Sequence, residues 1–305
     1  MENSNTMILF FTNVCNAHCR HCFVSPLNKH GTQVMDFNVF EKAIGLAERR
    51  HLDRVVVSGG ESFLYWGKIT EYLHKISINN RIRFSLCTNG YWACNNDLRK
   101  RYLHELGAHN FDTLEISTDS FHQEYIDLEQ CIVPLIKDAI SLGFHLDVTV
   151  CYERLMNEVH TINTIKQILT DKGSLHVRPI SGFGSAKDNK ITAKYSFVSE
   201  KKCTAAGELC VRYDGQCFIC CGPPLVYDIC EFMVGNIKTD NPESIWQSYS
   251  EKRIIDIMQN GSLPDIKQKC IEYNEDSEGT SLCHECICYN TGDTFGSMMR
   301  KERVL

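Results

Sequence analysis

The chain has 305 residues, of which 43% are apolar and 23% are charged, and its formal net charge is −6. This composition is typical of a folded domain with a sizeable core, and it excludes a disordered or collagen-like chain and argues against a basic nucleic-acid binder. The sequence shows no signal peptide and no apolar run near the roughly 18 residues of a membrane span, so we expect a cytoplasmic protein that binds neither nucleic acid nor membrane.

Residues 1–180 alternate between predicted strands and predicted helices. Short apolar or β-branched runs predict strands at Met7–Thr12, Arg54–Ser58, Arg83–Cys87, Thr113–Ser117, Leu146–Cys151 and Leu175–Pro179. Helical spacing of apolar residues predicts helices at Asp36–Arg50, Ile69–Ile76, Asn96–Leu106, Leu128–Leu142 and His160–Leu169, with Asp36 as an N-cap. Six such repeats predict an α/β fold, in which a parallel sheet is covered by helices and is either open or rolled into a barrel. Ligands gather at the carboxyl ends of the strands in such folds.

The first group of cysteines directly follows the first predicted strand. Cys15, Cys19 and Cys22 have the spacing CxxxCxxC. Three thiolates on one short loop can hold three corners of a [4Fe–4S] cluster, which leaves one iron open to a further ligand. A zinc site is the alternative, because His18 or His21 offers the fourth ligand that zinc requires.

This loop and four later motifs together resemble the radical S-adenosylmethionine (radical SAM) superfamily. The later motifs follow successive predicted strands: Ser58-Gly59-Gly60-Glu61, Thr88-Asn89-Gly90, Ser117-Thr118-Asp119 and Val177-Arg178-Pro179. The resemblance implies a partial (βα)6 TIM barrel whose three loop cysteines hold a [4Fe–4S] cluster. It also implies that S-adenosylmethionine is bound by Gly59, Gly60, Glu61, Asn89, Ser117, Asp119 and Arg178. The glycines are expected to let the backbone approach the cofactor, and Glu61 to face its ammonium group.

The chain contains 17 cysteines, and ten of them lie from Cys203 onward. This change in composition predicts a domain at 1–180, a linker at 181–202 and a small cysteine-rich domain with a tail at 203–305. An odd count and a cytosolic location argue against a framework of disulfides. We therefore expect the isolated cysteines to pack in the core: Cys87, Cys94, Cys131 and Cys151.

The cysteine-rich region begins with a predicted β-hairpin, Leu209–Tyr213 and Gln216–Ile219, around an Asp214-Gly215 turn. Its cysteines resemble the auxiliary-cluster region called SPASM, or its shorter form, the twitch domain. The resemblance implies a second [4Fe–4S] cluster bound by Cys203, Cys220, Cys283 and Cys286, with zinc on the same residues as the alternative. The seven-cysteine pattern of a full SPASM domain is missing, so the roles of five cysteines stay open: Cys210, Cys217, Cys230, Cys270 and Cys288. Of these, Cys230 is expected to be buried.

Cys221 directly follows the expected ligand Cys220. Adjacent residues of an extended segment point to opposite sides, so one thiol can bind iron while the other faces the active site. This pair and the order of the motifs resemble bacterial radical SAM peptide epimerases, which convert L-residues to D-residues in ribosomal peptides. The resemblance implies that a 5′-deoxyadenosyl radical removes a Cα hydrogen and that Cys221 returns one from the opposite face.

Three other functions stay open on the sequence alone. They are epimerisation or oxidation of a sugar or aminoglycoside, formation of a thioether in a peptide, as in sactipeptide maturation, and a non-enzymatic zinc module. The expected partners are a peptide or a small sugar-type substrate, and an electron donor such as flavodoxin or ferredoxin.

Overall fold

The structure is a computed structural model that describes residues 5–76, 81–169, 171–191, 207–251, 283 and 286–287. Within these residues the strands form one nine-stranded sheet in the order β6-β5-β4-β3-β2-β1-β7-β8-β9. The strands are β1 (Thr6–Thr12), β2 (Arg54–Gly59), β3 (Arg83–Thr88), β4 (Phe111–Ser117), β5 (His145–Tyr152), β6 (Gly173–Pro179), β7 (Leu209–Arg212), β8 (Gln216–Phe218) and β9 (Met233–Asn236). The helices are α1 (Phe37–Arg49), α2 (Trp66–Lys75), α3 (Asn96–Ala108), α4 (Val133–Ser141), α5 (Val159–Ile168), α6 (Ser185–Asp188), α7 (Pro223–Val226) and α8 (Pro242–Ser250).

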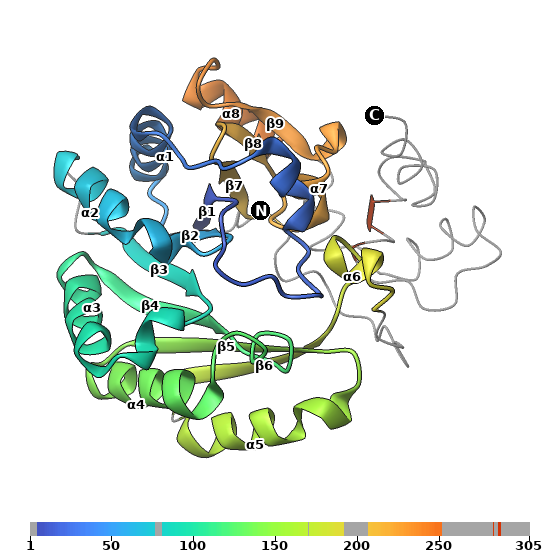
Figure 1. The fold of residues 1–305 in the computed structure, drawn as a ribbon. Coiled ribbons are helices and arrows are strands. Elements are labelled where there is room, and N and C mark those ends of the chain that lie inside the picture. Colours follow the sequence, from blue (N-terminus) through green and yellow to red (C-terminus); the bar gives the residue numbers. More distant parts are fainter. Residues whose placement is uncertain are drawn as a thin grey trace.

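The predicted α/β fold is confirmed. Strands β1 to β6 pair in parallel, and the helices α1 to α5 lie outside the curved sheet, as in a partial TIM barrel (Figure 1). Asp36 caps α1 as predicted, since its side chain accepts a hydrogen bond from the backbone N–H of Val39 at 2.9 Å. The helix predicted at Leu128–Leu142 is divided, because Leu128–Ile132 forms a π-helical turn (η4) before α4 begins.

The core lies between the sheet and the helices. Because both faces of a parallel sheet are covered, its strands are nearly continuous apolar runs, and Leu9, Val57, Leu86 and Leu114 are fully buried. This packing fixes the strand ends, from which the motif-bearing loops leave. No helix of the described residues is long and apolar enough to cross a membrane.

The predicted hairpin of the cysteine-rich region joins this same sheet. β7 pairs in parallel with β1, and β8 pairs antiparallel with both β7 and β9. Gly215 at the turn has a φ of +89°, which favours glycine. The buried Arg212 side chain pairs with Asp214 and Asp228, both at 2.7 Å, and so ties the hairpin to the segment that follows α7. The strands before and after the linker predicted at 181–202, β6 and β7, therefore belong to the same sheet.

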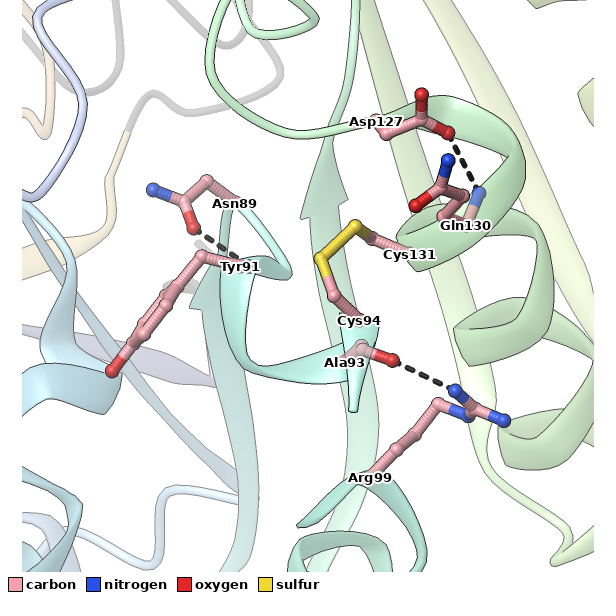
Figure 2. Close-up of a disulfide and its surroundings, with 8 residues drawn as sticks. All are labelled: Asn89, Tyr91, Ala93, Cys94, Arg99, Asp127, Gln130 and Cys131. Carbon is pink, nitrogen blue, oxygen red and sulfur yellow. Dashed lines mark hydrogen bonds between the residues drawn. A yellow bond between two sulfur atoms is a disulfide. The ribbon is translucent and has the colours of Figure 1, made fainter. Parts of the chain in front are cut away.

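Two predictions about cysteines were wrong. Cys94 and Cys131 do not merely pack in the core but form a disulfide (Figure 2). They are 37 residues apart in sequence, yet the loops that carry them leave the same edge of the neighbouring parallel strands β3 and β4. Cys230 is exposed, because it begins a short 3-10 helix at the surface and its thiol donates a hydrogen bond to Glu231.

Candidate functional site

The loop after β1 brings the three cysteines of the CxxxCxxC motif together. The N–H of Cys22 donates to the carbonyl oxygen of Cys19 at 3.0 Å, which folds the loop back on itself. Burial raises the pKa of the Cys19 thiol, and the nearby thiols of Cys22 and Cys15 raise it further. Three sulfur atoms whose negative charges would repel one another form a donor set that fits a cationic iron–sulfur cluster, which binds thiolates.

The end of β2 packs directly on this loop. The N–H of Gly60 donates to the carbonyl oxygen of Thr12, and the N–H of Glu61 donates to that of Val14, both at 2.7 Å. A Cβ atom on Gly59 would lie 2.3 Å from the Thr12 oxygen, and one on Gly60 would lie 2.3 Å from the Val14 oxygen. Only glycine permits this approach, so the two glycines support the cluster loop itself. Their predicted contact with S-adenosylmethionine stays a prediction.

The Glu61 side chain is buried and joins the second motif to the third. Its carboxylate accepts hydrogen bonds from the Thr88 hydroxyl at 2.9 Å and from the N–H of Asn89 at 2.7 Å. The Asn89 amide in turn donates to the Asn16 side chain at 2.9 Å and to the sulfur of Cys15 at 3.8 Å. Burial raises the pKa of Glu61 to about 7, although these hydrogen bonds oppose the shift.

The carboxylate of Asp119, which follows β4, is buried between two histidines. It lies 2.9 Å from Nδ1 of His122 and 3.6 Å from Nε2 of His21, and one ligand atom from each of the three residues lies within 4.8 Å of the others. Burial lowers the pKa of His21 to about 4, so this ring is neutral at neutral pH. Ser117 is half-buried at the end of β4. Asp119 thus lies beside His21 of the cluster loop, and this pairing with two histidines was not predicted. Its predicted contact with S-adenosylmethionine stays a prediction.

A second group of thiols lies around Gly222, between β8 and α7. A Cβ atom on Gly222 would lie 3.4 Å from the sulfur of Cys220 and 4.0 Å from that of Cys283. Burial raises the pKa of the Cys220 thiol, and Cys221, Cys283 and Cys286 raise it further. Three of the four expected auxiliary ligands are therefore close together. Three cysteines lie outside the described residues: Cys203, Cys270 and Cys288.

Cys221 contacts a different set of groups. Its thiol donates to Oε2 of Glu208 at 3.6 Å. Burial raises the pKa of the neighbouring Cys210 thiol, and Cys221 raises it further. Close by, the Cys87 thiol donates to Oε2 of Glu115 at 3.1 Å, and its pKa is raised by burial first, then by Glu115, and also by Cys221. Two thiol–carboxyl pairs from distant parts of the chain therefore lie near enough for the charge of one to shift the pKa values of the other.

Arg178 acts on the carboxyl groups of both pairs. It lies on β6, and its charge lowers the pKa values of both Glu115 and Glu208. Burial nevertheless raises the pKa of Glu208 to about 7. Glu115 could have been found from the sequence, because it is a lone charged residue in the apolar strand TLEIS. Glu208 gave no such signal.

The motifs that form this site lie in a segment that matches a known protein family. Residues 9–169, which hold the cluster loop and the motifs after β2, β3 and β4, match the family model of the radical SAM superfamily. The chain belongs to the radical SAM superfamily. It is therefore a radical SAM enzyme, and its cofactors are a [4Fe–4S] cluster and S-adenosylmethionine.

Two curated proteins are similar to this radical SAM chain. It is 23% identical over 219 residues to the putative peptide biosynthesis protein YydG of Bacillus subtilis (strain 168), covering 69% of this chain and 67% of that protein. It is 31% identical over 117 residues to a GTP 3′,8-cyclase of Heliobacterium modesticaldum, covering 37% and 33% of the two chains.

Two solved structures share the fold. Native anSMEcpe with bound AdoMet and Cp18Cys peptide has a TM-score of 0.53 and 13% identity, and the match covers 98% of this chain and 99% of that one. Streptococcus suis SuiB bound to S-adenosylmethionine has a TM-score of 0.53 and 12% identity, covering 80% and 65%. At this identity the likeness shows the radical SAM fold alone.

Proposed function

We propose that this radical SAM enzyme converts an L-residue of a ribosomally made peptide into the D-form. A peptide substrate is supported by the similarity to a putative peptide biosynthesis protein and by the shared fold with an enzyme solved with a bound peptide. The observation that carries the epimerase proposal is the position of Cys221, a free thiol that donates a hydrogen bond to the carboxyl group of Glu208.

We assign the cofactors to the residues that the motifs indicate. Cys15, Cys19 and Cys22 hold the [4Fe–4S] cluster. S-adenosylmethionine is bound by Gly59, Gly60, Glu61, Asn89, Ser117, Asp119 and Arg178. An auxiliary [4Fe–4S] cluster is bound by Cys203, Cys220, Cys283 and Cys286. When bound, the reduced cluster and S-adenosylmethionine supply a 5′-deoxyadenosyl radical, and the protein supplies its placement and the exclusion of water.

The residues of the chain then control where hydrogen is returned. After a Cα hydrogen has been removed from one face of the peptide, the thiol of Cys221 gives its hydrogen atom to the opposite face, which inverts the centre. The sulfur radical that remains needs one electron, which the auxiliary [4Fe–4S] cluster would supply when bound, and one proton. The carboxyl group of Glu208, 3.6 Å from this sulfur, is placed to supply the proton.

The test begins with a search of the neighbouring genes for a short precursor peptide, and a peptide found there is incubated in heavy water with the reconstituted enzyme. The wild type should give a product that is heavier by one deuterium at Cα and contains a D-residue. The Cys221→Ala variant should give no such product. The control Cys230→Ala removes an exposed thiol that has no proposed function, and it should give the same product as the wild type. Deuterated product from Cys221→Ala would contradict the donor role, and a product that has lost two hydrogens would indicate oxidation or thioether formation instead.

A further inference from the structure

The segment that contains α6, residues 184–189, packs against the cluster loop, and the proposed function does not use it. The N–H of Ser185 donates to the carbonyl oxygen of Cys22 at 2.9 Å. A Cβ atom on Gly184 would lie 2.4 Å from the same oxygen, and Gly184 has a φ of +59°, so only glycine permits this approach. This α6 segment is therefore in direct contact with the last ligand of the CxxxCxxC motif.

The other end of the α6 segment binds the same loop. The side-chain amide of Asn189 donates to the carbonyl oxygen of Arg20 at 3.1 Å and to that of Ser185 at 2.8 Å. Arg20 lies between the ligands Cys19 and Cys22 in the sequence. Because a carbonyl group that accepts a hydrogen bond from a fixed donor cannot turn freely, these contacts limit how far the ligand-bearing loop can move.

Tyr227 holds the α6 segment in place. Its hydroxyl oxygen accepts a hydrogen bond from the N–H of Gly184 at 2.9 Å, and its ring centre lies 6.1 Å from that of Phe183. Gly184 is buried, so its N–H group needs a partner within the protein. Loss of the hydroxyl group would leave this donor unpaired at the residue that touches the cluster loop.

Tyr227 directly follows α7, the short helix beside the auxiliary thiols. Its N–H donates to the carbonyl oxygen of Pro223 at 2.9 Å, and the N–H of Leu225 donates to that of Gly222 at 3.1 Å. The N–H of Gly222 in turn donates to the sulfur of Cys220 at 3.3 Å. Hydrogen bonds through one short helix therefore connect an expected auxiliary ligand with the residue that holds the α6 segment.

We propose that Tyr227 is a positioning residue for the radical SAM cluster, which it couples to the auxiliary site through the α6 segment. Tyr227 acts on the cluster loop through Gly184 and Ser185. The coupling rests on the auxiliary ligands assigned under the proposed function, whereas the effect of Tyr227 on the cluster loop requires only the cofactors of the superfamily. None of the experiments below uses a peptide, so a failure of the epimerase proposal would leave their results standing.

The first experiment removes only the hydroxyl group, in Tyr227→Phe. Amide hydrogen exchange of the reconstituted enzyme is read at single residues by mass spectrometry. Exchange at the N–H of Ser185 should become about 2- to 10-fold faster, although its own acceptor on Cys22 is unchanged. The control Tyr213→Phe removes a buried hydroxyl that has no hydrogen-bond partner within the described residues, and it should exchange like the wild type. Unchanged exchange at Ser185 in Tyr227→Phe overturns the inference.

The second experiment separates positioning from folding. The electron paramagnetic resonance signal of the reduced enzyme is titrated with S-adenosylmethionine, and the concentration that gives half of the change should rise about 2- to 10-fold in Tyr227→Phe but not in Tyr213→Phe. Iron content and thermal midpoint are measured on the same samples, because a merely structural role would lower these without altering the response of the clusters that remain. A wild-type response in Tyr227→Phe overturns the positioning role.

A second variant covers the case in which Tyr227→Phe does not retain its cluster. Asn189→Ala removes the hydrogen bond to the carbonyl oxygen of Arg20 from an exposed position, where the loss of a side chain is tolerated. It should shift the response to S-adenosylmethionine in the same direction. A wild-type response in Asn189→Ala would then overturn the inference.

The third experiment tests the connection to the auxiliary site. Cys283→Ala/Cys286→Ala removes two expected ligands without changing α7, and the control Cys230→Ala removes an exposed thiol. The double variant should contain less iron and should exchange faster at Ser185, whereas the control should match the wild type. Tyr227→Phe should add less to this exchange rate than it adds in the wild type, because both changes act through one contact.

The iron content distinguishes the two ways in which the third experiment can fail. Wild-type exchange at Ser185 in a double variant that has lost iron overturns the coupling. If the double variant keeps all of its iron, the auxiliary ligands assigned under the proposed function are wrong and the coupling falls with them. The effect of Tyr227 on the cluster loop is then decided by the first two experiments alone.

Discussion

The carboxylate of Glu61 accepts a 2.7 Å hydrogen bond from the backbone N–H of Asn89, 28 residues further along the chain. Glu61 ends the motif after β2, and Asn89 lies in the motif after β3. The Asn89 side chain continues the connection to Asn16 in the cluster loop. Three motifs that are separate in the sequence therefore form one hydrogen-bonded unit, and a change in one should alter the others.

We expect Glu61→Gln to lower the free energy of unfolding by about 1–3 kcal/mol, the cost of leaving a buried donor unpaired. The Glu61 carboxylate accepts from the N–H groups of Phe63 and Asn89, and the added amide N–H₂ would face one of these donors. Affinity for S-adenosylmethionine should fall as well, because the Asn89 turn loses its anchor. Urea denaturation and binding titrations measure the two effects. Glu71→Gln is the control, because it alters an exposed residue on α2 whose surface ion pair with Lys75 contributes little, and it should change both quantities far less.

Gly60→Ala should strongly reduce the iron bound by the CxxxCxxC loop. The new Cβ would lie 2.3 Å from the carbonyl oxygen of Val14, a backbone atom that can move only if the loop moves. Iron content and absorbance near the 400 nm region, after anaerobic reconstitution, report the loss. Gly67→Ala is the matched control, because a Cβ at Gly67 meets no atom within 4 Å. Equal iron contents in the two variants would contradict the proposed support role of Gly60.

The sequence predicted features that depend on neighbouring residues, and it missed those that depend on how distant segments meet. The helical spacing of apolar residues and the N-cap Asp36 predicted both ends of α1 to within one residue. The contact between Cys221 and Glu208 was not predictable, because no periodicity marks a carboxylate that precedes a hairpin. The Cys94–Cys131 disulfide was missed for the same reason, since it joins two loops whose approach is set by the order of strands β3 and β4.

The Cys94–Cys131 disulfide should stabilise the fold by about 2–4 kcal/mol, as expected when a crosslink closes a loop of this length in the unfolded chain. It joins the turn that follows Asn89 to η4 (Figure 2). We therefore expect dithiothreitol to lower the thermal midpoint of the wild type, and the double variant Cys94→Ser/Cys131→Ser to show that lowered midpoint without reductant. Peptide mapping without reduction should recover the crosslinked pair. A double variant that dithiothreitol destabilises as much as the wild type would show that another thiol is responsible.

The turnover rate should fall as the pH rises through about 7, because Glu208 then loses the proton that it supplies to Cys221. Burial raises the pKa of Glu208 to about 7, and Glu115 adds to the shift, while the hydrogen bond from Cys221 and the charge of Arg178 oppose it. Since the pKa is higher in the folded than in the unfolded protein, this group stabilises the fold at low pH and loses that contribution as the pH passes through the folded value.

The decisive comparison is between the wild type and Glu208→Gln, with kcat measured from about pH 6 to about pH 8.5. The amide keeps the size of the side chain but cannot donate a carboxyl proton, so kcat should fall by about 10²–10⁴-fold at low pH, the usual contribution of a positioned acid. The change of kcat with pH near 7 should also disappear in this variant. Glu208→Asp, which retains a titratable group, should be slow but should keep a pH-dependent rate. A break near pH 7 that persists in Glu208→Gln would assign the titration to another residue and remove Glu208 from the proposed proton transfer.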